Sequence, residues 1–424
     1  KHFNIKSKMI KKFLISSCLL LSLVTFSQEG TSSPYSFYGI GESRFNGNVE
    51  SRSMGGISMI PDSTRINFQN PAGYGNLKWT NFTVAASSDY KKQKSGTSNA
   101  TAKRTTLDYI ALAIPLGKFG AGFGLVPYSS VGYKIENIYE DGSQNSKRFN
   151  GWGGMNRVFL GTGYRILPSL SIGATAYYNF GKIQTNSVKF LPYVPIGSRE
   201  LNVTDLTGLN LNFGLMYQYK LKDKITLFSS LTYTPKSTLV SNNDRTISTV
   251  TINSDFDYTD VDSYDKVTTK TDLELPQKWS FGLGIGDAKK WVFGADVALQ
   301  DVGKLYNTYN TLDNVTYTKY QRYGFGGFYT PTTNPFFSYA KRITYRGGFV
   351  YEKTGLVVNS TAINDVGMTL GVGLPITGSL SNLNVGFEFG KKGTTSNNLV
   401  QENYFILNIG FSLNDKWFVK SKFR

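Results

Sequence analysis

The sequence predicts an all-β fold, a transmembrane antiparallel β-barrel of about 14 strands, on the basis of three features. Apolar residues alternate with small or polar ones along most of the chain, and this period of two belongs to strands rather than helices. The alternating segments exceed the roughly 5 to 6 residues usual in soluble sheets and suit the about 9 to 11 residues of an outer-membrane strand. Short turns interleave with long polar segments, as in barrels whose short turns lie in the periplasm. A soluble sandwich or propeller is the alternative, but it would have shorter strands and more even loops.

Residues 1–27 have the order of a secretory signal peptide. Five lysines precede an apolar run from Phe13 to Phe26, and a polar stretch follows the run. The run is shorter than the roughly 20 residues of a transmembrane helix, and the signal makes best sense if it starts at Met9. Cys18 would allow a lipid anchor, but the apolar run continues past it, which disfavours this alternative. We expect export to a cell outer membrane of the Gram-negative type.

Export would remove the side chains on which much catalytic and metal chemistry depends. The single histidine, His2, and the single cysteine, Cys18, both lie within residues 1–27. The remaining chain would lack Ser–His and Cys–His nucleophile pairs, the usual zinc ligands and any disulfide framework. We therefore expect no enzyme, no catalytic residue, no metal and no cofactor.

The chain is basic, with a formal net charge of +17, and it stays basic after the five lysines of the signal are removed. Its cations are scattered over expected loops, including a cluster between Lys91 and Arg104, rather than aligned along one helix. This distribution disfavours nucleic acid as a partner. It suits outer-membrane lipids with phosphorylated head groups, or simply solvated loops.

A cluster of aspartates lies in one expected loop, and clustered carboxylates can hold calcium. The cluster lacks the glycine turn and final glutamate of an EF-hand loop, so a solvated acidic loop is the favoured interpretation. Its members are Asp255, Asp257, Asp260, Asp262 and Asp265.

A small-residue segment precedes the strands. In SRSMGGISMI, Met54 and Ile57 have helical spacing, but Gly55 and Gly56 limit any helix to a short turn. A short helical turn packed in a confined space is the structure expected there.

Residues 66–77, INFQNPAGYGNL, contain a rigid corner. Pro71 fixes its own φ and lacks an N–H, and it pushes Asn70 into an extended conformation. Gly73 and Gly75 are expected to adopt backbone conformations that are closed to other residues.

Beyond this corner the strand pattern is clearest in residues 207–220. There Leu209 and Leu211 share an apolar face that would contact lipid, and Asn210 and Asn212 share the opposite face. Long polar loops are expected at 91–103, 134–154, 184–206, 239–271 and 302–317. Aromatic girdles at the membrane interfaces are expected from Trp79, Tyr133, Tyr219, Trp279 and Trp417.

The corner and the strands together resemble the FadL family of outer-membrane transporters. In that family a small-residue segment and an Asn-Pro-Ala-Gly turn lead from a lumenal hatch into the first strand, and Asn70, Pro71, Ala72 and Gly73 match the turn. The motifs LELPQKWSFGLGIG, WVFGADVALQ, ITYRGGFVYEKTG and VGMTLGVGLPI extend the resemblance over nearly the whole chain. The C-terminal part, NVGFEFGKKGTT through ENYFILNIGFSLNDKWFVKSKFR, is similar to a branch that includes barrel subunits of type IX secretion.

This resemblance implies an N-terminal hatch segment at 28–77, with residues 39–62 inside the lumen, a barrel at 78–413 and a basic periplasmic tail at 414–424. The hatch and hinge residues would be Met54, Gly55, Gly56, Asn70, Pro71, Ala72 and Gly73. Glycines would point inward and leave room for a hatch or ligand at Gly120, Gly122, Gly124, Gly282, Gly284 and Gly286. Lumenal charges that pair with one another are expected at Arg157, Arg165, Asp296, Arg346 and Glu388.

Two functions follow from this resemblance. The first is passive transport of a hydrophobic or amphiphilic small molecule, which would enter among the aromatic residues of 306–329. The alternative is a non-enzymatic accessory subunit of a larger outer-membrane complex for protein secretion or assembly. An outer-membrane enzyme such as a lipase is disfavoured because the exported chain would have no histidine.

Overall fold

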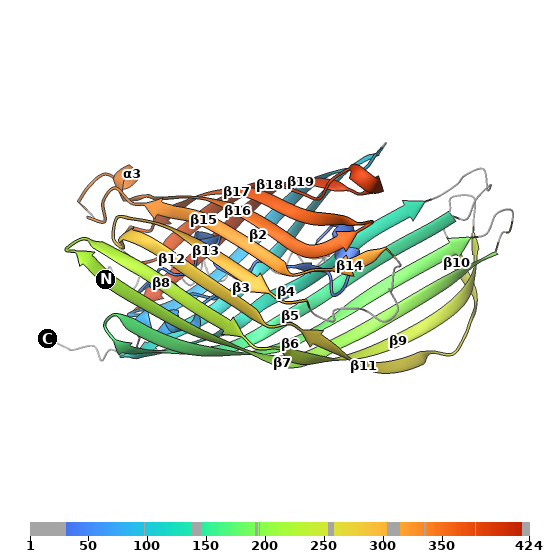
Figure 1. Cartoon of the computed structure of the whole chain (residues 1–424), viewed down its shortest axis with the longest axis horizontal. Coiled ribbons are helices and arrows are strands. Elements are labelled where there is room, and N and C mark those ends of the chain that lie inside the picture. The colour runs from blue at the N-terminus through green and yellow to red at the C-terminus, as the bar shows by residue number, and fades with distance from the viewer. Residues whose placement is uncertain are drawn as a thin grey trace, which may run out of the picture.

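The computed structural model describes residues 31–96, 98–137, 146–190, 194, 196–252, 258–302, 314–334, 336–377 and 379–417. Within these residues the chain forms a closed antiparallel barrel with 14 strand positions. Figure 1 shows the barrel from the side, with its longest axis horizontal. The barrel closes where the last strand pairs with the first, with Phe411 opposite Val84. The predicted fold class and strand number are confirmed. The expected signal peptide and residues 418–424 of the expected tail lie outside the described residues.

Each wall position is filled by one strand or by two consecutive strands. Pro235 and Pro276 divide two of the positions, because proline cannot donate to a strand ladder. In chain order the wall consists of β2 (Thr80–Lys94), β3 (Asn99–Leu116), β4 (Phe119–Asn137), β5 (Ser146–Leu167), β6 (Leu170–Phe190), β7 (Ile196–Lys222), β8 (Ile225–Thr234) with β9 (Ser237–Ile252), β11 (Val267–Leu275) with β12 (Lys278–Asp287), β13 (Trp291–Gln300), β15 (Tyr320–Tyr329), β16 (Thr344–Val358), β17 (Thr361–Pro375), β18 (Asn382–Lys392) and β19 (Gln401–Asp415).

The outer face of the wall carries the apolar side chains that the alternation predicts. On β7, Leu209 and Leu211 are exposed while Asn210 and Asn212 face inward and are buried. Four of the five expected girdle aromatics are partly or fully exposed near strand ends. Tyr133 is the exception: it points into the barrel and packs edge-to-face on Phe37 at 5.0 Å between ring centroids. Its assignment to a girdle was therefore wrong.

The two ends of the barrel differ in how far the strands extend. We call the end where β2 begins the short-turn end, and the opposite end, where β9 and β10 (Tyr258–Ser263) lie, the tall end (Figure 1). Most of the predicted long loops are strand instead: 91–103 forms the ends of β2 and β3, and 184–206 forms the ends of β6 and β7. The prediction failed there because these stretches lack the continuous outward apolar face that marks a strand against lipid, although Val188 and Phe190 are apolar and buried. In outer-membrane barrels the short turns usually face the periplasm.

Residues 31–77 form the longest stretch outside the wall strands in the part of the chain that the structure describes. They form η1 (Pro34–Phe37), β1 (Glu42–Ser43), α2 (Val49–Arg52) and η2 (Pro71–Asn76), while α3 (Tyr339–Arg342), η3 (Ser396–Asn398) and the short β14 (Val315–Tyr317) belong to connections between wall strands. None of the helices in the described residues has the length and apolar character to cross a membrane. The largest buried apolar cluster joins residues 31–77, including Ile66 and Tyr74, to inward side chains such as Tyr109 and Phe159.

Candidate functional site in the barrel lumen

Residues 31–77, here called the N-terminal segment, run inside the barrel from the tall end to the short-turn end. At the tall end Ser33 donates from Oγ to Glu402 on β19 at 3.0 Å. At the short-turn end Asn70 donates from Nδ2 to the carbonyl of Leu215 on β7 at 3.1 Å. The segment therefore contacts strands on opposite sides of the wall and extends along the lumen from one end of the barrel to the other.

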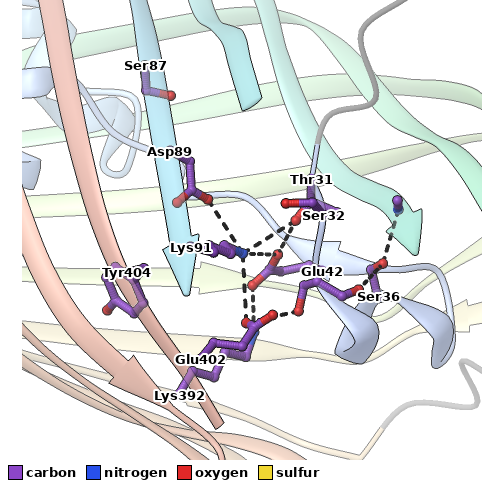
Figure 2. Close-up of polar contacts among 12 residues, drawn as sticks. Thr31, Ser32, Ser36, Glu42, Ser87, Asp89, Lys91, Lys392, Glu402 and Tyr404 are labelled. Atoms are coloured by element: carbon purple, nitrogen blue, oxygen red, sulfur yellow. Dashed lines mark hydrogen bonds and ion pairs between the residues drawn. The ribbon is translucent and has the colours of Figure 1, made fainter. Parts of the chain in front are cut away.

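A buried cluster of charges holds the tall end of the segment (Figure 2). Glu42 accepts from Lys392 at 2.7 Å through Oε1 and from Lys91 at 3.2 Å through Oε2. Lys91 also lies 3.5 Å from Asp89 and 3.8 Å from Glu402. Burial acts to raise the pKa of Glu42, but Lys392 and Lys91 outweigh it and hold this pKa well below its usual range. The cluster joins the segment to the seam where β2 and β19 close the barrel.

Lys91 was expected among the exposed loop cations, and this prediction was wrong. It lies on β2 and is 4% exposed. Alternation continues along β2 from Asn81, through Ser87, to Lys91, and each of these side chains faces inward and is buried. Extending the strand beyond residue 90 in the sequence would have placed Lys91 in the lumen. No local signal marks Glu42, Lys392 or Glu402 as its partners.

In the middle of the lumen, α2 is bound to the wall by a second set of ion pairs. Arg52 lies 2.8 Å from Glu388 on β18 through Nε and 3.8 Å from Asp108 on β3 through Nη1. Arg44 lies 3.3 Å from the same Asp108. Glu388 is therefore paired with the N-terminal segment.

The other expected lumenal charges do not pair with one another either. Asp296 accepts a hydrogen bond from the backbone N–H of Ser58, in the N-terminal segment. Arg346 donates to Asn384 at 3.1 Å, and Asn384 donates to Glu50 of α2 at 2.9 Å.

Two arginines of the expected set have no carboxylate partner among the described residues. Arg157 lies between Tyr128 and Tyr177, 4.0 and 4.8 Å from their ring centroids. Arg165 lies at the short-turn end, partly exposed. The prediction of mutual pairing was wrong. Glu388 and Asp296 contact the segment directly and Arg346 reaches it through Asn384, at separations in sequence that alternation does not encode.

Met54, Gly55 and Gly56 form a tight bend after α2. Gly55 and Gly56 have φ of 67° and 79°, in the left-handed region that favours glycine. The backbone N–H of Gly55 donates to Thr369 Oγ1 at 3.0 Å, and its carbonyl accepts from Arg322 at 3.0 Å. A Cβ on Gly55 would collide with the carbonyl oxygens of Phe325 and Phe349. The bend thus lies directly on the backbone of the wall.

Asn70, Pro71, Ala72 and Gly73 form the start of η2 at the short-turn end. Asn70 is extended, with φ −126° and ψ 109°, and its side chain caps η2 by accepting from Ala72 N at 3.0 Å. Neither Gly73 nor Gly75 has a positive φ, so the expected use of special backbone conformations was wrong. Glycine is needed for space instead, because a Cβ on Gly73 would lie 2.8 Å from Asn67 Cβ.

Glycines of the inner wall form the surface on which the segment lies. Of the six that were expected to leave room, Gly124 and Gly286 instead lie against neighbouring strand backbone. The other four contact the segment, as do further glycines on other strands. Those facing Met54 and Gly55 are Gly324, Gly326 and Gly348; those facing Met59 are Gly282, Gly284 and Gly294; those facing η2 and Asn70 are Gly120, Gly122, Gly161, Gly163, Gly173 and Gly214.

A cavity of about 410 Å³ remains between the segment and the wall. Its lining is strongly charged and includes Arg52, Asp108, Arg157, Lys278, Arg322 and Glu352. Hydrophobic ligands usually bind in pockets lined mainly by apolar and aromatic side chains. The lining also carries apolar groups, such as Tyr38, Tyr128 and Ile406, so the cavity suits a polar or amphiphilic group better than a purely apolar one.

The described residues contain no group of three or more acidic, histidine or cysteine side chains that could hold a metal. Within the aspartate cluster, Asp255 and Asp257 lie outside the described residues. Asp260 is 2.5 Å from Arg199, which offers it a cation partner from the protein itself.

The fold is similar to that of known outer-membrane channels. The Pseudomonas putida toluene transporter TodX is 15% identical over 88% of this chain and 98% of its own, with a TM-score of 0.55. A Pseudomonas aeruginosa FadL homologue is 11% identical over 89% of this chain and 99% of its own, with a TM-score of 0.57. At these identities the likeness establishes the fold alone, and it confirms the resemblance to FadL-type outer-membrane barrels.

Comparison with curated proteins finds no match. The model of one protein family, BamG, matches residues 9–424, which is almost the entire sequence. The chain therefore belongs to the BamG family, with the fold of a FadL-type outer-membrane β-barrel.

Proposed function

We propose that this protein is a non-enzymatic accessory subunit of an outer-membrane complex for protein assembly or secretion, and that its lumen stays closed. The observation that carries the proposal is the fixation of the N-terminal segment at both ends of the barrel. Buried ion pairs bind Glu42 to Lys91 and Lys392, and Asn70 binds the wall near the short-turn end. Membership of the BamG family supports the same role.

Passive transport of a hydrophobic or amphiphilic molecule is the second candidate. It is favoured by the similarity of the fold to a protein described as a toluene transporter. The charged lining of the cavity argues against it, because moving an apolar ligand past Arg52 and Asp108 would leave buried charges without solvent. Transport through the lumen from one end to the other would also require the N-terminal segment to move.

A disulfide between the segment and the wall separates the two candidates. Ser53 Oγ lies 2.6 Å from the position that a Cβ on Gly386 would take, so cysteines at these two positions are close enough to be joined. The sequence has no other cysteine beyond Cys18 of the expected signal.

We expect the oxidised double variant Ser53→Cys, Gly386→Cys to assemble with its partners in native outer membranes as well as the unmodified chain does. Each single cysteine variant is the control for the substitution itself. A locked barrel that still co-purifies with a stoichiometric partner supports the accessory role. Uptake of a hydrophobic compound that stops on oxidation and resumes on reduction would support transport instead.

A further inference from the structure

In the described part of the chain, the wall has an edge without a neighbouring strand at its tall end. Strands β10 and β11 pair with β9 on one side, over Tyr258–Ser263 and Val267–Leu275. On the other side the next wall strand, β13, reaches only to Gln300, which lies opposite Lys278 at the start of β12. Among the described residues, nothing forms a ladder with the second side of β10 and β11.

The edge is also uncovered. Ten consecutive residues, from Thr259 to Thr268, are all exposed. Three of them are large apolar residues, and Val261, Tyr264 and Val267 are 64%, 68% and 60% exposed. Soluble and membrane proteins normally shield such an edge, because its unpaired N–H and C=O groups pair readily with another strand.

The charges along the edge indicate the kind of strand that would fit. Asp262 and Asp265 have no cation partner among the described residues, whereas Lys266 is already paired with Asp244 at 2.9 Å. The edge is therefore locally acidic in a chain whose overall charge is +17. A second copy of this edge would bring like charges together, and a basic segment would not.

We propose that the edge formed by β10 and β11 binds an extended, lysine- or arginine-rich segment of another outer-membrane protein as an added β-strand. The backbone groups of the edge supply affinity, and the aspartates and exposed apolar side chains supply selectivity. This inference rests on the proposed function, since it names the surface by which an accessory barrel meets its partner.

Hydrogen exchange on the complex tests the proposal. The full chain is extracted gently from native outer membranes with its partner, and its amide exchange is compared with that of the purified barrel alone. We expect exchange of the amides in Val267–Leu275 to slow by about tenfold or more in the complex. The exposed η3 hairpin at the same end of the barrel is the internal control and should not change.

Charge reversal provides an independent measurement. About tenfold less partner should co-purify with the double variant Asp262→Lys, Asp265→Lys than with the unmodified chain. The control Asp223→Lys lies in an exposed turn at the short-turn end, and the normal amount of partner should co-purify with it. If the partner co-purifies normally but the amides of the edge exchange as fast as in the barrel alone, this inference is overturned and the accessory role is left intact. Recovery of no partner from any variant overturns the accessory role itself. A complex that contains only a second copy of the chain overturns the choice of a basic partner.

Discussion

Arg52 of the N-terminal segment donates a hydrogen bond from Nε to Glu388 of β18 across 2.8 Å, although 336 positions separate the two residues in the sequence. Both side chains are largely buried, at 17% and 16% exposure. Removing one partner of a buried ion pair leaves the other charge without compensation, which costs about 3 to 5 kcal/mol. This pair therefore makes a sensitive reporter of how firmly the segment is held.

We expect Arg52→Gln and Glu388→Gln each to lower the free energy of unfolding by about 3 kcal/mol, measured by urea titration of the barrel in lipid vesicles. The double variant should lose less than the sum of the two single variants, because both substitutions remove the same ion pair, while Arg52 keeps its longer contact with Asp108 until it is itself replaced. Lys182→Gln is the control: its pair with Asp205 is about half exposed, and the loss should be below about 1 kcal/mol. Strictly additive losses at Arg52 and Glu388 would contradict the pairing.

Gly55→Ala tests the close approach of the segment to the wall. The substitution adds a methyl group at a residue with φ of 67° and drives it against the carbonyl oxygens of Phe325 and Phe349. Gly117→Ala is a matched control, because Gly117 has φ of 77° but no atom within 4 Å of the added Cβ. We expect Gly117→Ala to cost about 1 kcal/mol from backbone strain alone. Gly55→Ala should lower the free energy of unfolding by about 2 kcal/mol more than Gly117→Ala does, because of overpacking. Equal decreases in the thermal unfolding temperature of the two variants would show that the segment can move away from the wall.

The strand pattern was predictable from the sequence, but the partners of the segment were not. Alternation depends only on neighbours along the chain, and lipid on one side of the wall makes it strong, as at Leu209 and Asn210. Residues 184–206 lack a continuous outward apolar face, so they looked like a loop although they form the ends of β6 and β7.

The candidate site was predictable only in its local features. The extended Asn70 follows from the proline after it, and the bend at Gly55 and Gly56 follows from their small size. Which wall residue meets Arg52 or Glu42 depends on the closure of the whole barrel and leaves no trace in local spacing.

Stability should depend on pH through Glu42. The pKa of Glu42 is lowered in the folded barrel by Lys392 and Lys91, although burial opposes this. A carboxyl whose pKa is lowered on folding contributes stability above its unfolded value of 4.5, and this contribution disappears as the pH falls through the lower folded value. We therefore expect the unmodified barrel to be more stable than Glu42→Gln near neutral pH, and the difference to vanish in strong acid.

Thermal unfolding of both proteins over a pH series gives this difference directly. Asp89 and Glu402 are present in both proteins and share Lys91 with Glu42, so the difference reports the titration of the whole charge cluster around Glu42. Asp223→Asn, in an exposed turn, controls for the loss of one negative charge. A stability gap at Glu42 that is constant with pH would mean that the Glu42 side chain acts through packing rather than through its charge.

The corner at the short-turn end should control leakage through the lumen if the N-terminal segment seals it. Asn70→Ala removes the cap of η2 and the hydrogen bond to Leu215, and Gly73→Ala forces a methyl group toward Asn67. A loss of about 1 to 2 kcal/mol raises the population of displaced segment about five- to thirtyfold. We expect both variants to increase the swelling rate of liposomes in a small sugar, and Asn403→Ala, on the exposed face of β19, to leave it unchanged. If leakage stays at the level of the unmodified barrel while stability falls, the corner directs folding and does not seal the lumen.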